Sequence, residues 1–183
     1  MRTFPYVAAI AASLLLACGG EKAPDAGDTK AQEAARRIRA MEDSVFTDSV
    51  FDHKAAQALL DVYLAYARQF PLDTLTPEYL FRAAGGKNTV GDPRGGIALY
   101  DRIIANYPHW RKTPDAYYLK ALSLDRDLHQ LGEAKAAYQT FIDNYPGSPL
   151  AAEARKMIEY LGLTDEELIK RLQAQNDSSQ ASK

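Results

Sequence analysis

The residue with the most distinctive chemistry in this chain is Cys18, the only cysteine among 183 residues. A disulfide needs two thiols, so an intramolecular bridge is excluded. Cys18 follows an apolar run, residues 7–17, in which Ser13 is the only polar side chain. About ten apolar residues are too few to span a bilayer as a helix, which needs roughly 20, but they suit the apolar core of a secretory signal. The pattern therefore indicates chemistry at the sulfur rather than a membrane-spanning helix.

The four residues from Leu15 to Cys18 resemble a bacterial lipobox, in which small residues admit the signal peptidase and the cysteine is acylated. The resemblance implies that residues 1–17 are a signal peptide and that several acyl chains on Cys18 anchor the mature protein, where one chain would bind only reversibly. Gly19 replaces the aspartate that resembles an inner-membrane retention signal, which favours the outer membrane, with the domain facing the periplasm. The alternatives are a secretory signal with a chance cysteine and a buried apolar segment.

Other residue types capable of catalysis or metal binding lack the required spacing. Residues 85–96, GGKNTVGDPRGG, do not complete a phosphate-binding loop, because no Ser or Thr follows the lysine and no strand precedes it, so an inter-helix turn is favoured. The chain has three histidines, His53, His109 and His129. They fall on different segments and lack the i, i+4 pairing of a helical zinc site. Asp125, Asp127 and His129 fit no calcium-loop spacing and indicate a solvated helix end. With no GxSxG serine either, the sequence predicts no enzyme, no cofactor and no metal site.

The composition fits one anchored domain with polar ends. The formal net charge is −2, without the basic excess of a nucleic-acid-binding surface, so nucleic acid is not an expected partner. Residues 18–29 are polar and rich in small side chains, which predicts a flexible tether. Residues 30–172 are long enough for one domain with its own core. Residues 173–183 hold no apolar side chain other than two alanines and are expected to be disordered.

Three nine-residue segments can be aligned with one another, and each ends in an aromatic residue followed by a proline. They are YLAYARQFP, YDRIIANYP and YQTFIDNYP, ending at Pro71, Pro108 and Pro146. The prolines are 37 and then 38 residues apart, a period that suits a two-helix unit with its turns.

Apolar residues in these segments recur at i, i+3, i+4 and i+7, which places them on one face of a helix. Proline cannot continue a helix, so each segment ends in a stop. The Thr-Pro pairs at 76–77 and 113–114 then read as helix starts, with the threonine hydroxyl as N-cap and proline as the first helical residue. The predicted helices lie near residues 30–43, 53–69, 77–89, 94–106, 114–128, 131–144, 149–161 and 165–174.

The phrase AKAAYQTFIDNYPGSPLAAEA, residues 134–154, is similar to the tetratricopeptide repeat shared by the Tol-Pal-associated coordinator family and the BamD family of outer-membrane assembly lipoproteins. The preceding unit departs from the pattern, because Gly96 takes the small-residue position and Gly85 and Gly86 interrupt its first helix. The whole-chain layout resembles compact lipidated repeat proteins common in Bacteroidetes. The resemblance implies an all-α fold, an antiparallel helix-pair solenoid of about three repeats with a C-terminal capping helix.

The last predicted helix has the pattern of a cap. Thr164 and Glu167 form a capping box, in which each side chain accepts from the other residue's backbone amide. Leu168, Ile169 and Leu172 are then expected to cover the open edge of the final repeat, because each repeat buries its face only against neighbours.

Residues 42–52, EDSVFTDSVFD, fit neither a helix nor a strand period, and predict a partly extended connector. Its apolar side chains are expected to pack into the first repeat, namely Val45, Phe46, Val50 and Phe51.

In repeat proteins of this kind the first helix of each pair usually lines the concave groove. By position this makes Tyr79, Arg82, Tyr117 and Lys120 candidates for binding an extended peptide, with aromatic faces for packing and cations for carboxylates. The alternative is that both tyrosines pack between helices. Trp110 reads either as an exposed contact or as a lid over the repeat junction.

The sequence therefore favours a non-catalytic lipoprotein whose repeats bind another envelope protein or peptide, in outer-membrane protein assembly or in coordinating cell-wall synthesis. A solute- or glycan-binding accessory lipoprotein is the rival class, and self-association through the terminal repeat is a third. The oligomeric state is left open.

Overall fold

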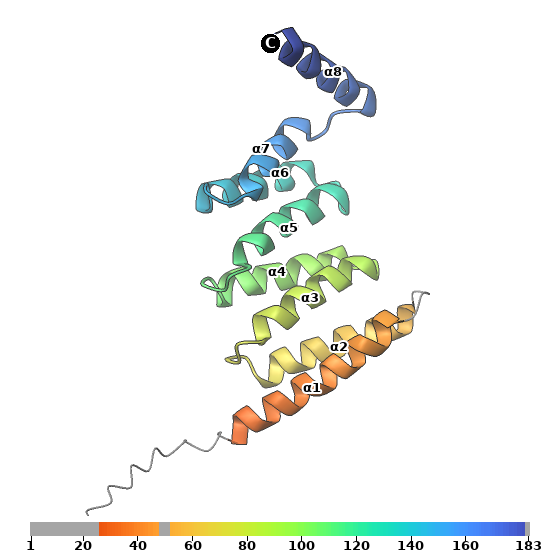
Figure 1. The fold of residues 1–183 in the computed structure, drawn as a ribbon, viewed down its shortest axis with the longest axis vertical. Coiled ribbons are helices and arrows are strands. Elements are labelled where there is room, and N and C mark those ends of the chain that lie inside the picture. Colours follow the sequence, from red (N-terminus) through yellow and green to blue (C-terminus); the bar gives the residue numbers. More distant parts are fainter. Residues whose placement is uncertain (1–25, 48–51, 182–183) are drawn as a thin grey trace, which may run out of the picture.

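The computed structural model describes residues 26–47 and 52–181, and over these residues the chain is helical apart from short turns. Within them lie eight helices: α1 (Ala26–Thr47), α2 (His53–Gln69), α3 (Thr76–Thr89), α4 (Pro93–Asn106), α5 (Thr113–Arg126), α6 (Leu131–Asn144), α7 (Leu150–Tyr160) and α8 (Asp165–Ala181). Each helix from α1 to α7 packs against its neighbours in the chain, so the helices stack along the long axis of the molecule (Figure 1). This is the predicted all-α, tetratricopeptide-like solenoid.

Helices α2 to α7 begin and end within two residues of the predicted bounds, whereas α1 is longer at both ends. Residues 26–29 are helical where a tether is predicted, and residues 42–47 are helical rather than partly extended. No glycine or proline stands between residues 28 and 47 to end the helix, and Val45 packs against the core of α1, α2 and α3. The side chain of Phe46 and residues 48–51 lie outside the described part of the chain.

The two Thr-Pro pairs start helices as predicted, but the threonines are not N-caps. Thr76 and Thr113 are the first residues of α3 and α5, and neither helix has a side-chain N-cap bond. Their buried hydroxyls instead donate backward, to the carbonyl oxygen of Phe70 at 2.5 Å and of Tyr107 at 2.6 Å. Burial favours this contact because a hydroxyl without a partner would be costly there. Each threonine thus ties the start of one helix to the end of the previous one.

Most of residues 85–96 lies in helices, and only Gly91 of their glycines lies in a turn between helices. Gly85 and Gly86 lie inside α3, so the helix is not interrupted there, and only residues 90–92 separate it from α4. A Cβ on Gly86 would lie 2.5 Å from a Leu60 methyl group, and one on Gly96 would lie 2.8 Å from the Ala84 carbonyl oxygen. Gly96 therefore excludes a larger side chain, because α3 and α4 approach closely there, whereas at Gly86 the flexible Leu60 side chain would have to move.

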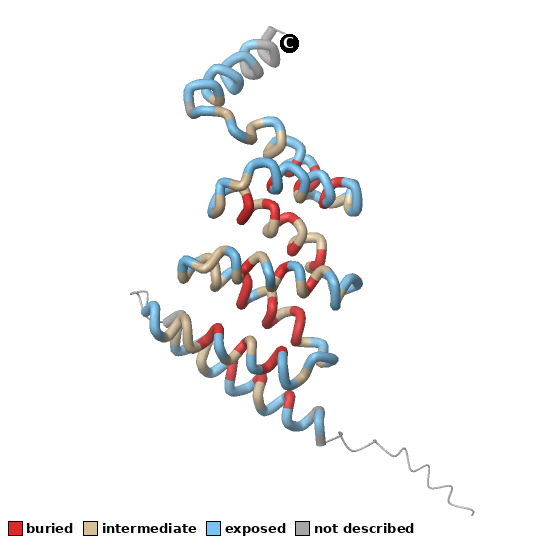
Figure 2. The backbone as a smooth tube through the Cα atoms, turned by 180° about the vertical axis from the view of Figure 1, so that it is seen from behind, coloured by how far each residue is buried: buried red, intermediate tan, exposed pale blue. Residues whose placement is uncertain are grey.

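The core consists of contacts between successive helices. The three aromatic residues eight positions before the prolines are nearly or fully buried: Tyr63, Tyr100 and Tyr138. Gly96 and Ala134, at the predicted small-residue positions, are buried as well. Figure 2 shows the buried residues where neighbouring helices face one another, and few of them beyond α6.

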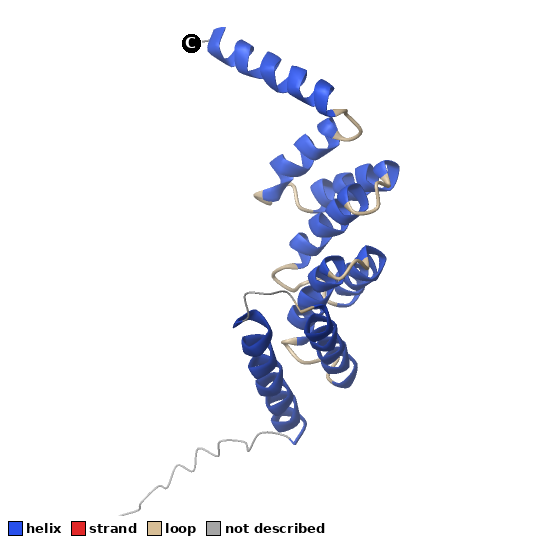
Figure 3. Ribbon diagram, turned by 90° about the vertical axis from the view of Figure 1, so that its right-hand side faces the viewer, coloured by secondary structure: helices blue, strands red, loops and turns tan. Residues whose placement is uncertain are grey.

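Helix α8 differs from the predicted cap. Its capping box is confirmed, since Thr164 donates its amide to Glu167 Oε2 at 2.8 Å and the Glu167 amide donates to Thr164 Oγ1 at 3.3 Å. The covering role is wrong for Ile169 and Leu172, which are 54% and 47% exposed, and α8 leads away from the stack (Figure 3). It also continues through residues 173–181, which are helical rather than disordered, because no glycine or proline ends the helix.

Candidate functional site

The two tyrosines predicted to line a groove lie between helices. Tyr79 is 4% exposed and stacks on Tyr63, with ring centroids 5.4 Å apart. It also meets Tyr66 edge to face, and the centroids of that pair are 4.7 Å apart. Tyr117 is half-buried and meets Tyr145 edge to face at 5.4 Å. Such pairs add stability beyond the area they bury. These contacts favour the packing interpretation that the sequence leaves open.

The two predicted cations are each ion-paired within the chain. Arg82 donates to Glu42 at 2.6 Å and to Glu78 at 3.1 Å, and Lys120 lies 2.7 Å from Asp101. A carboxylate of a bound peptide would have to compete with these partners.

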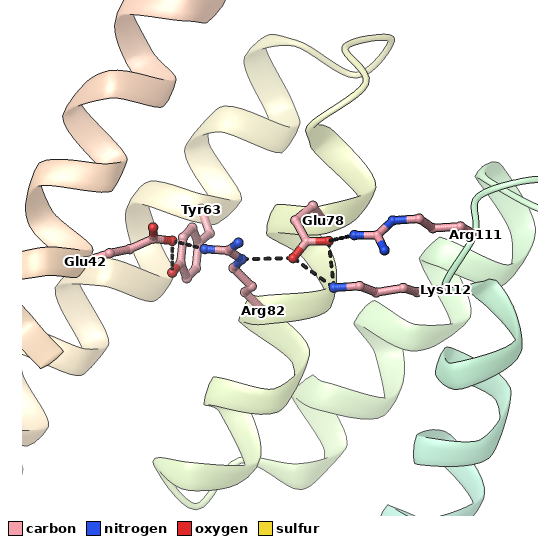
Figure 4. Close-up of polar contacts among 6 residues, drawn as sticks. All are labelled: Glu42, Tyr63, Glu78, Arg82, Arg111 and Lys112. Carbon is pink, nitrogen blue, oxygen red and sulfur yellow. Dashed lines mark hydrogen bonds and ion pairs between the residues drawn. The ribbon is translucent and has the colours of Figure 1, made fainter. Parts of the chain in front are cut away.

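The ion pairs of Arg82 belong to a network that joins successive units on one face (Figure 4). Glu42 on α1 accepts a hydrogen bond from Arg82 at 2.6 Å and another from the Tyr63 hydroxyl on α2 at 2.5 Å. Glu78 on α3 accepts from Lys112 at the start of α5 at 2.9 Å, and Arg111 lies 4.0 Å away. The network therefore holds α1, α3 and α5 in register.

Glu78 is the acidic centre of this network. Partial burial alone would raise the pKa of its carboxyl, but hydrogen bonds from Lys112 and Arg82 outweigh that effect and lower the pKa below its ordinary value of 4.5. Glu78 is therefore ionised at neutral pH, and its charge balances one of the cations around it.

Trp110 is the half-buried residue of the turn between α4 and α5, and its contacts agree with the lid interpretation. Its ring meets Phe81 edge to face, with centroids 5.6 Å apart. The Lys112 ammonium lies 5.2 Å from the Phe81 centroid and 5.8 Å from that of Trp110. These cation–π contacts fix the turn over α3.

Beside this turn lies a groove of about 490 Å³ between the α4–α5 and α6–α7 turns. Arg111 of the α4–α5 turn, whose side chain is 76% exposed, and Asp115 at the start of α5 line it on one side. Tyr145 and residues 146–149 (PGSP) line it on the other. A partly exposed ring, prolines and an exposed cation whose pair with Glu78 is 4.0 Å long can hold an extended peptide by packing and by pairing with a carboxylate. We treat this turn groove as the candidate site.

None of the four groove residues predicted from the sequence, Tyr79, Arg82, Tyr117 and Lys120, lines this groove. Arg111, next to Trp110, does line it, but residues 145–149 read only as a helix stop in the sequence. The repeated aromatic-proline turn is the signal that could have found them, because equal turns in successive units lie side by side in a solenoid.

The remaining sequence candidates stay apart in the structure. His53 starts α2, His109 lies in the α4–α5 turn, and His129 lies between α5 and α6 with φ of 52°. Among the described residues no three His, Cys, Asp or Glu side chains converge as a metal site would require. In that same part of the chain, no helix has the length and apolar character needed to cross a bilayer. Cys18 lies outside the described residues.

The arrangement of this chain agrees with comparisons to known proteins. The outer membrane protein assembly factor BamD of Xylella fastidiosa strain 9a5c is 29% identical over 110 residues, which cover 51% of this chain and 38% of that protein. BamD of strain Temecula1 is 28% identical over 110 residues, which again cover 51% of this chain and 38% of that protein. The match thus spans about two fifths of the length of these relatives. The family model for the outer membrane lipoprotein YfiO matches residues 53–168, which hold α2 to α7 and the whole turn groove, and the chain therefore belongs to the YfiO family of outer membrane lipoproteins.

Proposed function

We propose that this protein is a non-catalytic adaptor of outer-membrane protein assembly, anchored by lipid at Cys18 and facing the periplasm, which binds an extended segment of another envelope protein in the turn groove. The observation that carries the proposal is the family match, because it covers every helix and turn that builds the groove. The curated relatives are named as outer membrane protein assembly factors.

The mechanism is tethered recognition. Acylation confines the domain to the membrane surface, which raises its effective concentration near membrane partners without any new contact. The groove supplies Tyr145 for packing and Arg111 for a carboxylate, while the neighbouring cations remain bound to Glu78. Because the Tyr117–Tyr145 ring contact joins α5 to the α6–α7 turn, the groove is preformed and loses little entropy on binding.

Site-specific photo-crosslinking in cells tests the groove. Gly147 lies in the groove and Gly132 at the start of α6, and at either position an added Cβ would meet nothing within 4 Å. A benzoyl-phenylalanine placed at Gly147 should capture components of β-barrel assembly, and the same residue at Gly132 should not.

The captured proteins decide between the two envelope roles. Exclusive capture of Tol-Pal or peptidoglycan-synthesis proteins at Gly147 would replace the assembly role with the coordinator role. Equal capture from Gly132 would show that the groove is not the binding site.

Metabolic labelling with an alkyne-bearing palmitate tests the anchor separately. The wild-type protein should carry the label, and Cys18→Ser should lose it because the acylated thiol is gone. Label that persists on the variant would contradict lipidation at this residue.

A further inference from the structure

We propose that one corner of the molecule, made by Lys30, Arg36 and Arg37 of α1 and by Leu72 of the α2–α3 turn, binds directly to an anionic phospholipid surface. This membrane corner is distinct from the turn groove, and it assigns the solenoid an orientation on the membrane.

The first observation is a local excess of positive charge. Residues 30–40 hold four basic side chains against one acidic one, a net charge of +3, whereas the whole chain carries −2. Lys30, Arg36 and Arg37 are exposed on α1, and Glu33 offsets part of this charge by pairing with Arg37. An exposed pair of this kind is weak, so Arg37 can exchange Glu33 for a phosphate at little cost.

The second observation is an exposed apolar side chain beside this charge. Leu72 is 96% exposed, more than any other large apolar side chain in the described part of the chain. It follows Phe70 by two residues, and Phe70 shares a groove of about 320 Å³ with Lys30 and Arg37. Figures 1 and 3 both place the start of α1 beside the α2–α3 turn.

The chemistry of this corner fits a bilayer rather than a purely ionic ligand. Basic side chains pair with the phosphates of anionic headgroups, and each contributes modestly, so several are needed. An exposed leucine gains by entering the boundary between headgroups and acyl chains, which a nucleic acid or an acidic peptide does not offer. The half-buried Val62 lines the same groove and adds apolar character to it, above the buried Ile38.

The position along the chain agrees with this orientation. Seven residues lie between Cys18 and Ala26, the first residue of α1, and the eight steps along the chain reach at most roughly 28 Å when extended. This step rests on the proposed acylation, but the charge and the exposed leucine do not. A lipid chain combined with a basic surface binds membranes far more firmly than either one alone.

Vesicle binding of the chain from residue 19 onward tests the corner without the anchor, and this chain keeps every described helix. It should bind vesicles containing phosphatidylglycerol and release them as salt rises, with little binding to pure phosphatidylcholine. Reversal of Lys30, Arg36 and Arg37 to glutamate should weaken the binding about tenfold or more.

The matched control reverses three exposed basic residues at the other end of the solenoid, Lys135, Arg155 and Lys156, with the same change in net charge. Binding should then fall by less than about twofold, because distant charges are screened. Equal losses in the two triple variants would overturn the proposal, as would absence of binding to the anionic vesicles.

An environment-sensitive fluorophore tests the apolar contact. The chain from residue 19 has no cysteine, so Leu72→Cys and the control Ile169→Cys can each be labelled at one site. On anionic vesicles the probe at Leu72 should shift to the blue and brighten, and the probe at Ile169 should not change. A change at Ile169 alone would place the membrane at the opposite end and overturn the proposal. Failure of these tests leaves the crosslinking and lipidation tests of the proposed function unaffected.

Discussion

The three aromatic-proline turns have the same backbone hydrogen bonds, but they differ in one side-chain hydrogen bond. In each turn the amide two residues after the proline bonds to the aromatic residue's carbonyl, and the amide five residues after the proline bonds back into the turn. Thr76 and Thr113 occupy that fifth position in the first two turns and add their buried hydroxyl bonds, whereas Ala151 occupies it in the third. The backbone signal thus repeats, while the tie between units weakens toward the C-terminus.

Packing follows the same gradient. Six residues are buried in α3 and six in α5, but only Ala151 and Ala154 are buried in α7, and no large apolar side chain of α8 is. A solenoid's stability is approximately a sum of units and their interfaces, so we expect the C-terminal end to open first. Four changes test this contrast between the two ends of the solenoid.

Removing a buried aromatic ring should separate the two regions most clearly. Tyr100, at 2% exposure, packs against Phe81 with centroids 5.9 Å apart, and Tyr100→Ala should lower the free energy of unfolding by about 3–5 kcal/mol. Leu172→Ala in α8 should cost less than about 0.5 kcal/mol because that side chain is exposed. Urea unfolding followed by circular dichroism measures both, and similar losses would refute the gradient.

Two glycines of the same region should respond in opposite directions. Gly96→Ala should destabilise by about 1–3 kcal/mol, because its Cβ would meet the Ala84 carbonyl oxygen. Gly85→Ala has open space within α3 and should stabilise by up to about 1 kcal/mol. Thermal unfolding of both variants measures the difference, and a stabilising effect at Gly96 would contradict the close approach.

The threonine ties can be removed from one junction and added to another. Thr113→Val keeps the shape but loses the bond to Tyr107, which should cost about 1 kcal/mol. Ala151→Thr supplies the missing hydroxyl at the third junction and should slow hydrogen exchange in α7. Unchanged stability in Thr113→Val would show that these hydroxyls do not tie the units.

The ion-pair network predicts a pH dependence confined to the N-terminal units. The folded-state pKa of Glu78 is lowered, so its contribution is present above its ordinary pKa of 4.5 and is lost as pH falls through the folded value. When the pH falls from 5 to 3, the free energy of unfolding should therefore drop by about 0.5–1 kcal/mol less in Glu78→Gln than in the wild type. Glu159→Gln, whose exposed pair with Arg171 is 3.4 Å long, should follow the wild-type curve, and a matching change there would contradict the assignment.

Local sequence signals were enough to predict the helices, their proline stops and the Thr164–Glu167 capping box, because these signals act within a few residues of one another. The groove residues that the sequence predicts by position are engaged within the chain, because Tyr79 is buried and Arg82 pairs with two carboxylates.

Tertiary contacts determine which way the threonine hydroxyls point and why Gly96 must be small. They also determine that α8 leaves its apolar side chains exposed and meets α7 only near Arg171 among the contacts described. The tertiary structure also brought Glu42, Arg82 and Lys112 into one network from three separate helices or their caps. The physical reason is common to all of them. Burial, close approach and ion pairing depend on atoms that neighbouring helices supply, and a local pattern holds no information about which neighbour will be there.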